Sequence, residues 1–200
     1  MPAPDPAGIS VPFEIEMERL FLRCPRPGDG LGMNAAIRES ITELRPWMPF
    51  ATPVPTVEET ERFVTETFRA FEDKRGFGFR MVEKQTGAFA GNIGTHGFNW
   101  SVPMCEIGYW VRSCCTGRGY ASEATRALTV MAFDLLRMER VGIRCDSRNV
   151  ASRRVAEKAG YRFEGTLRCD SRAPDGSLRD TLVFSMIRRE YENIRRGRGV

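Results

Sequence analysis

The segment Cys114-Cys-Thr-Gly-Arg-Gly-Tyr-Ala-Ser-Glu-Ala124 is the most informative part of the chain for its architecture. The segment before it, Glu106-Ile-Gly-Tyr-Trp-Val111, is rich in aromatic and β-branched residues and predicts a strand. The segment after it predicts a helix, because apolar side chains recur at the spacing of one helix face. These side chains are Ala124, Leu128, Met131 and Leu135. Gly117 and Gly119 therefore lie in a turn from strand to helix.

Such a turn is suited to binding an anion. Glycine lets the backbone adopt positive φ and approach a ligand, and the first N–H groups of a helix have no partner within the helix. A phosphate is stabilised at that position. The segment lacks both the Walker pattern G-x-x-x-x-G-K-[ST] and the third glycine of the dinucleotide fingerprint. We therefore expect a different phosphate-bearing ligand, although a plain strand-to-helix turn also needs glycine.

A second segment, Asn149-Val-Ala-Ser-Arg-Arg-Val-Ala-Glu-Lys-Ala-Gly-Tyr161, predicts a short helix. Asn149 is a favoured cap at its start, and Gly160 suits the left-handed position just past its end. Its apolar face consists of Val155, Ala156 and Ala159. A strand over Tyr161–Arg168 is predicted to follow.

The remaining periodicities predict strands mixed with helices. Helices are expected over 30–43 and from the capping box Thr56-Val-Glu-Glu59 onward to a point before Gly76. Further strands are expected over 19–23, 78–83, 89–96, 141–146 and 182–187, with hairpin turns at Lys84–Gly87 and Asp175–Gly176. This order indicates an α+β (α/β) sandwich around one sheet.

The two segments together, G-x-G followed by Glu-Ala and then N-x-x-S-x-x-V-x-E-K-x-G-Y, resemble the Gcn5-related N-acetyltransferase (GNAT) superfamily. Leu44-Arg-Pro-Trp-Met-Pro49, Glu106-Ile-Gly-Tyr-Trp110 and Phe163-Glu-Gly165 resemble its RimJ/RimL group, which acetylates N-terminal amines of ribosomal proteins. The resemblance spans roughly Glu18 to Tyr191. It departs from the superfamily at Cys114, where the pattern has arginine or glutamine.

The resemblance implies the GNAT fold, with a mixed, mostly antiparallel central sheet of about seven strands flanked by helices. It implies an acyltransferase that moves an acetyl group from acetyl-CoA to a primary amine by direct attack on the thioester. The acceptor is either a protein N-terminal α-amine or a small-molecule amine. An open groove between the Trp47 region and the hairpin at 170–176 would indicate a peptide, and a closed pocket lined with carboxylates would indicate a small cation.

The resemblance also implies which residues bind the cofactor. Backbone N–H groups near Tyr109 would hold the pantetheine and the thioester oxygen where the strand splays, and the G-x-G turn would hold the phosphates. Asn149 matches a cofactor-contacting asparagine, in addition to its role as a cap. The implied set is Tyr109, Trp110, Val111, Thr116, Gly117, Arg118, Gly119, Tyr120, Ala121, Asn149, Ser152 and Arg154. Arginines near the turn can pair with phosphate groups; they are Arg112, Arg118, Arg126, Arg153 and Arg154.

Three residues are the catalytic candidates. Ser152 matches the serine that the RimL group is thought to use to protonate the coenzyme A thiolate; its other interpretation is a polar residue in a helix's first turn. The carboxylate that the group places beyond the Phe163 strand is Ser171 here, with Asp170 adjacent. Glu106 is the other candidate base, acting through a water, although a structural carboxylate is the favoured interpretation. The alternative is that amines lose protons to solvent without a dedicated base.

Trp47 and Phe50 match the region that walls the acceptor pocket in this group. For Trp47, ordinary core packing is the favoured interpretation.

The length of 200 residues predicts one catalytic domain over 18–192, between a flexible N-terminal arm, 1–17, and a basic C-terminal tail, 193–200. Six cysteines without a C-x-x-C pair, and no secretory signal, predict a cytoplasmic, reduced protein. No apolar run is long enough for a membrane span, and a single histidine, His96, predicts no metal site. Homodimers are common in the group.

Two other function classes stay open. A non-catalytic acyl-CoA-binding or sensing protein is conceivable because the family's base position is changed. RNA binding through the arginines near the C-terminus would depend strongly on salt, but a net charge of +4 is mild and such a tail is more often solvated. Nucleic acid is therefore not an expected partner.

Overall fold

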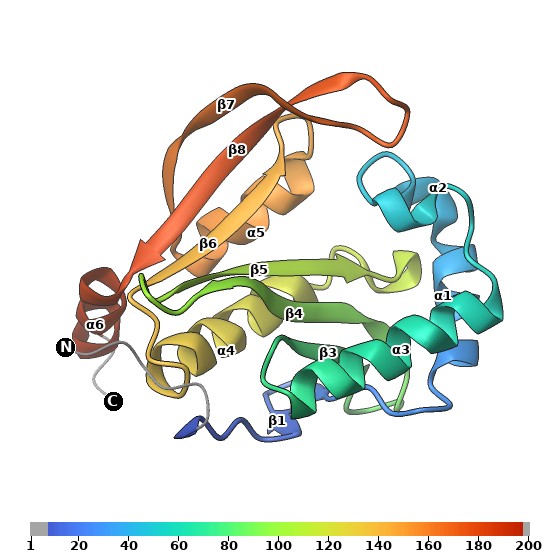
Figure 1. The fold of residues 1–200 in the computed structure, drawn as a ribbon, viewed down its shortest axis with the longest axis horizontal. Coiled ribbons are helices and arrows are strands. Elements are labelled where there is room, and N and C mark those ends of the chain that lie inside the picture. Colours follow the sequence, from blue (N-terminus) through green and yellow to red (C-terminus); the bar gives the residue numbers. More distant parts are fainter. Residues whose placement is uncertain (1–7, 198–200) are drawn as a thin grey trace.

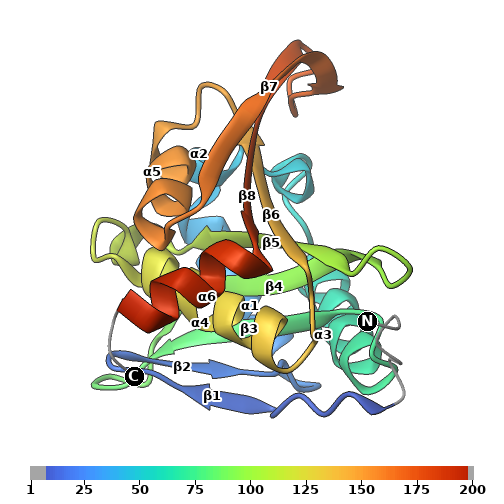
Figure 2. The same ribbon diagram turned by 90° about the vertical axis from the view of Figure 1, so that its left-hand side faces the viewer.

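The computed structural model describes residues 8–197 and contains one mixed sheet (Figures 1 and 2). Its strands are β1 (Glu14–Glu16), β2 (Leu20–Arg23), β3 (Phe77–Glu83), β4 (Phe89–Asn99), β5 (Met104–Val111), β6 (Arg140–Asp146), β7 (Arg162–Arg172) and β8 (Leu178–Ile187). They lie in the order β1-β2-β3-β4-β5-β6-β8-β7. All neighbouring pairs are antiparallel except β5 and β6. The mostly antiparallel GNAT-type sheet is thus confirmed, with eight strands in place of about seven.

The helices are α1 (Gly30–Glu39), α2 (Ile41–Leu44), α3 (Val57–Glu72), α4 (Tyr120–Asp134), α5 (Val150–Ala159) and α6 (Arg188–Gly197). Helix α4 is the crossover that a parallel β5–β6 pair requires, and it packs on β2, β4 and β5. Helices α1 and α3 pack on each other and on β4 and β3. Two cores result, because alternate residues of a strand face opposite sides. Ile107 of β5 belongs to the larger core with Leu128 of α4, and Trp110 belongs to the smaller one with Met33 of α1.

Strands β5 and β6 separate along their length. They pair only from Met104–Arg140 to Glu106–Gly142, while β5 continues beside β4 to Val111. Figure 1 shows the two strands diverging from this point. The edge of β5 over residues 107–111 therefore has no strand partner on the β6 side within the described chain. The predicted splay of this strand is present.

The two chain ends differ from the sequence-based expectation. Residues 14–16 of the predicted arm form β1 on β2, and Phe13 stacks on Phe71 with ring centroids 5.0 Å apart. Helix α6 extends through most of the predicted tail, because Tyr191 is buried against Phe133 and Arg195 pairs with Asp134 at 2.8 Å. The expectations for 1–7 and for 198–200 lie outside the described residues.

The hairpin of β7 and β8 extends beyond the rest of the sheet (Figure 2). In Figure 1 its tip lies across from the segment that contains α2. None of the helices within residues 8–197 is both long and apolar enough to cross a membrane. Over the same residues, no cluster of three or more His, Cys, Asp or Glu side chains could hold a metal ion.

Candidate active site

The turn before α4 forms a cradle of free backbone donors. Gly117 and Gly119 have φ values of +73° and +80°, the left-handed region that favours glycine. Gly119 occupies the cap position of α4, where no side chain accepts a hydrogen bond, and Glu123 N–H donates to the Gly119 carbonyl at 3.1 Å. Among the hydrogen bonds of the described residues, none uses a backbone N–H of residues 117–122. These donors and the positive end of the helix dipole can bind phosphate.

Side chains hold this cradle in place. Arg19 donates to the Arg118 carbonyl at 2.7 Å and pairs with Glu123 at 2.6 Å, which ties the start of β2 to the start of α4. Glu83 accepts from Tyr120 and from Arg118, the latter at 3.1 Å. Hydrogen bonds to Glu83, first from Thr86 and then from Tyr120, lower its pKa, so it remains a carboxylate.

The expected cluster of arginines is only partly available for phosphates. Arg112 is bound to Glu39 of α1 and Arg153 to Glu157, both through contacts of 2.8–2.9 Å. Arg118 lies at the cradle itself with about half of its side chain exposed. The other two arginines of the expected cluster are Arg126, which is half-buried in α4, and Arg154, which is exposed on α5. Arg118 is the one of these arginines that lies within the turn itself, although it too has a carboxylate partner, Glu83 at 3.1 Å.

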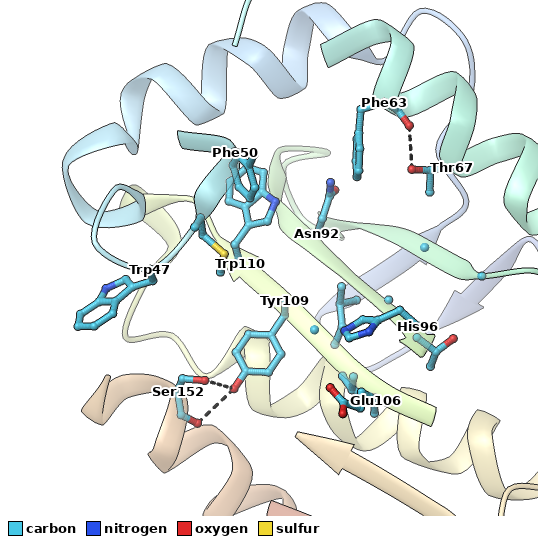
Figure 3. A pocket seen from close by; sticks show the side chains of 18 of the residues that line it. Trp47, Phe50, Phe63, Thr67, Asn92, His96, Glu106, Tyr109, Trp110 and Ser152 are labelled. Atoms are coloured by element: carbon cyan, nitrogen blue, oxygen red, sulfur yellow. Dashed lines mark hydrogen bonds between the residues drawn. The ribbon is translucent and has the colours of Figure 1, made fainter. Parts of the chain in front are cut away.

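The start of α5 carries a chain of hydrogen bonds that reaches β5. Asn149 caps the helix, its Oδ1 accepting from the Ser152 N–H at 3.0 Å. The Ser152 hydroxyl lies 2.9 Å from the Tyr109 hydroxyl, which also donates to the Ser152 carbonyl at 3.2 Å. Figure 3 shows Tyr109 crossing from β5 toward Ser152. Burial raises the pKa of Tyr109, so its hydroxyl keeps its proton and serves as a donor.

The side chain of Tyr109 is the functional group that sequence reasoning missed, because only the backbone N–H of this residue was assigned a role. The sequence signal for this role was the alternation of side chains between the two sides of strand β5. It places Tyr109 on the opposite side from Glu106 and Gly108. That side faces the gap left by the diverging strands, where α5 begins.

A cavity of about 1060 Å³ lies over β3, β4 and β5, between α1, α3 and the segment 47–55. Gly78, Gly94 and Gly108 are neighbours across the three strands and form a floor without side chains. A Cβ atom at Gly78 would lie 2.5 Å from Thr67 Cγ2, so this glycine permits the close approach of α3. The walls are largely aromatic and include Trp47, Phe50, Phe63 and Trp110 (Figure 3).

A second, smaller cavity of about 470 Å³ adjoins the first at Trp47. It lies between the segment 42–52 and the tip of the β7–β8 hairpin, where Pro174 and Asp175 line it together with Arg148. Trp47 is half-buried and belongs to neither core, so the expectation of core packing is wrong; the residue lines both cavities instead. Phe50 is 40% exposed and lies 6.2 Å from Trp110, ring to ring.

The three catalytic candidates are not brought together. Ser152 and Glu106 both line the large cavity. Asp170 is not among the lining residues; it pairs with Arg144 at 2.6 Å, and hydrogen bonding, first from Thr181, lowers its pKa. A carboxylate so stabilised in its charged form is a poor proton acceptor at neutral pH. The cavity is reached instead by the neighbouring Ser171.

The comparisons with known proteins agree with this geometry. The family model described as "Acetyltransferase (GNAT) domain" matches residues 19–162. The chain is similar to "Putative ribosomal N-acetyltransferase YdaF" of Bacillus subtilis (strain 168), with 28% identity over 88% of this chain and 94% of that protein.

Solved structures show the same similarity. A solved structure described as "a putative ribosomal-protein-serine acetyltransferase from Vibrio cholerae" is 26% identical, with a TM-score of 0.73 over 88% of this chain and 97% of that chain. Mycobacterium smegmatis RimJ in complex with a CoA-disulfide is 24% identical, with a TM-score of 0.78 over 90% of each chain. The expected RimJ/RimL resemblance is confirmed, and no comparison supports a non-catalytic sensor. The chain belongs to the GNAT acetyltransferase family and is an acetyl-CoA-dependent N-acetyltransferase.

Proposed function

We propose that the acceptor is the N-terminal α-amine of a protein. The observation that carries this proposal is the open groove formed by the two adjoining cavities, which runs from the splayed strand past Trp47 to the tip of the β7–β8 hairpin. An extended chain end needs such a groove, whereas a small amine does not. The relative named as a ribosomal N-acetyltransferase supports a protein acceptor.

The charges along the larger cavity also favour a single amine over a polyamine. Three carboxylates occur among its described lining residues, Glu59, Glu106 and Asp146. Asp146 is paired with Arg148 at 2.8 Å, and Glu59 completes the capping box of α3. One carboxylate, Glu106, is left to attract an ammonium group, which suits a molecule with one positive charge.

Acetyl-CoA supplies the thioester, and the residues of the chain hold it at two places. The free N–H groups of 117–122, with Arg118, bind its phosphates. On the unpaired edge of β5, the N–H groups of Tyr109 and Val111 donate to its pantetheine and to the thioester oxygen, whereas the N–H of Trp110 points toward Asn92 of β4. Preorganised donors of this kind contribute a few kcal/mol, on the order of 3, when negative charge develops on that oxygen.

In the transfer itself, the nitrogen of the neutral amine forms a bond to the thioester carbon and loses one proton toward solvent, while the carbon–sulfur bond breaks. The departing thiolate takes a proton from the Ser152 hydroxyl, which lies 2.9 Å from the Tyr109 hydroxyl. Because Tyr109 stays protonated, it can replace the proton that Ser152 gives up. Asn149 holds the first turn of α5 that presents Ser152.

A comparison of acceptors tests the proposal. Release of free coenzyme A thiol is measured with synthetic peptides that differ in their first residue and with small amines. We expect peptides to react with the higher kcat/KM. Substitution Trp47→Ala should raise KM for the peptides and leave small amines unaffected, and the exposed, non-lining Phe163→Ala is the matched control. Turnover of small amines alone would refute the protein acceptor.

A cytoplasmic location and a homodimeric state remain predictions. The second is checked by sedimentation of the purified chain.

A further inference from the structure

We propose that His96 receives the proton of the attacking amine, while Glu106 stabilises the resulting imidazolium. This inference rests on the proposed direct transfer to a primary amine, and it deepens that function by naming the proton acceptor.

The sheet register places the two side chains together. His96 of β4 is the direct cross-strand partner of Glu106 of β5. Directly opposed residues in an antiparallel pair have Cβ atoms about 4.5–5.5 Å apart on the same face of the sheet. Both residues line the large cavity, and Figure 3 shows them adjacent at one end of it.

The imidazole lies over Gly108, next to Tyr109. A Cβ atom at Gly108 would be 3.1 Å from His96 Nε2 and 3.4 Å from Cδ2, so the ring occupies the space that a side chain at 108 would fill. Tyr109, the next residue of β5, points to the opposite side of the strand, where its hydroxyl contacts Ser152. His96, which lies over Gly108, would then accept the proton of the amine, and Tyr109 would support the proton donor of the thiolate, Ser152.

The surrounding charges suit a proton acceptor. On β6, Arg140 is bound to Glu164 at 2.5 and 2.6 Å, and Arg144 to Asp170 at 2.6 Å, so both neighbouring cations have partners other than Glu106. The carboxylate of Glu106 interacts with Arg140 only through charge, accepts no hydrogen bond from another described residue, and can therefore stabilise an imidazolium. An imidazole is a better match than a carboxyl group for a base that works near neutral pH.

The proton balance is complete. The ammonium of the acceptor gives one proton to His96, which releases it to solvent because the residue is exposed. The amine lone pair is then free to attack the thioester carbon. Once the new carbon–nitrogen bond has formed, the nitrogen gives up a second proton by the same route, through His96 to solvent, and the amide results as the carbon–sulfur bond breaks. The thiolate takes one proton from Ser152, and solvent restores that proton through Tyr109.

The test is the substitution His96→Ala with chemical rescue. We expect kcat to fall by about 10²-fold, within the range of general base catalysis, and to rise again as imidazole is added. The dissociation constant for acetyl-CoA, measured by calorimetry, should not change. Ser152→Ala is the matched control, because its defect lies on the thiolate side and imidazole should not restore it.

His96→Gln provides a second variant of similar size that cannot accept the proton, and it should show the same loss. Retention of more than about a third of the wild-type kcat in either variant, or a loss in His96→Ala that imidazole does not reverse, would overturn the inference. The assay uses whichever primary amine turns over. If small amines react and peptides do not, the protein acceptor is refuted while the role of His96 is still tested.

Discussion

Replacing Gly117 by glutamate should separate phosphate binding from folding. Gly117 has a φ of +73°, and a Cβ atom there would meet no atom within 4 Å. The folding cost is therefore limited to placing a non-glycine residue in the left-handed region, about 1–2 kcal/mol. In a domain of this size, each kcal/mol lowers the melting temperature by about 2–4 °C.

The cost to acetyl-CoA binding should be larger, because a carboxylate would enter a cradle whose N–H groups 117–122 have no other hydrogen-bond partner among the described residues. At about 5 Å from a phosphate charge and an effective dielectric constant of about 20–40, the repulsion is about 1.7–3.3 kcal/mol. This corresponds to an affinity about 20- to 250-fold lower. Gly117 is preferable to Gly119 for this test, since Arg19 lies 3.5 Å from a Cβ at Gly119 and would neutralise the added charge.

Two controls isolate the charge. Gly117→Ala carries the same backbone strain without the carboxylate and should bind acetyl-CoA within a few-fold of wild type, about 3 at most. Gly176→Glu carries the same charge at a left-handed glycine that also has open space, on the β7–β8 hairpin. Calorimetric titration gives the affinities and thermal unfolding gives the stabilities. Equal acetyl-CoA affinities for Gly117→Glu and Gly117→Ala would refute the assignment of the cradle.

Three further predictions concern the thiolate proton, the helix cap and acid stability. Ser152→Ala should lower kcat by about 10²-fold with unchanged acetyl-CoA affinity, because it removes the proton donor and not the cradle; an unchanged kcat would exclude that role. Thr56→Ala should lower the free energy of unfolding by about 1 kcal/mol in urea titrations, because Thr56 Oγ1 accepts the Glu59 N–H at 3.1 Å in the capping box. Glu164 has a pKa of about 2, below the ordinary 4.5, chiefly because Arg140 donates a hydrogen bond to its carboxylate. The contribution of this carboxylate to the free energy of unfolding is therefore fully present above pH 4.5 and is lost as the pH falls toward 2. Glu164→Gln should therefore lose less stability than wild type between those pH values, and parallel unfolding curves for the two proteins would contradict the assignment.

Features that depend on neighbours along the chain were predicted well. The capping box at Thr56, the cap at Asn149 and the left-handed Gly117 and Gly160 all appear as expected. Each depends on φ preferences and on hydrogen bonds within a few residues, which the residue types determine directly. The resemblance to the GNAT superfamily then implied the cofactor and its place in the fold.

Predictions that depended on distant partners were less complete. Trp47 was expected in the core because tryptophan is a large apolar residue, but it lies where two cavities adjoin. Asp170 is near the family's carboxylate position in sequence, yet its carboxylate is paired with Arg144 of another strand and the residue does not line the cavity. Residues of the expected arm and tail pack on the domain because Phe71 and Phe133 offer them aromatic partners.

The sequence by itself determined most of the elements and the glycine turn before α4, because these are encoded in local periodicity and in short motifs, and the chemistry of transfer followed from the resemblance to the GNAT superfamily. Only the tertiary structure decided which groups meet. Ser152 reaches Tyr109 across 43 positions of the chain because β5 and β6 diverge beyond Glu106. His96 faces Glu106 because the register of β4 and β5 aligns them, and a shift of one residue would have turned the two side chains to opposite faces of the sheet.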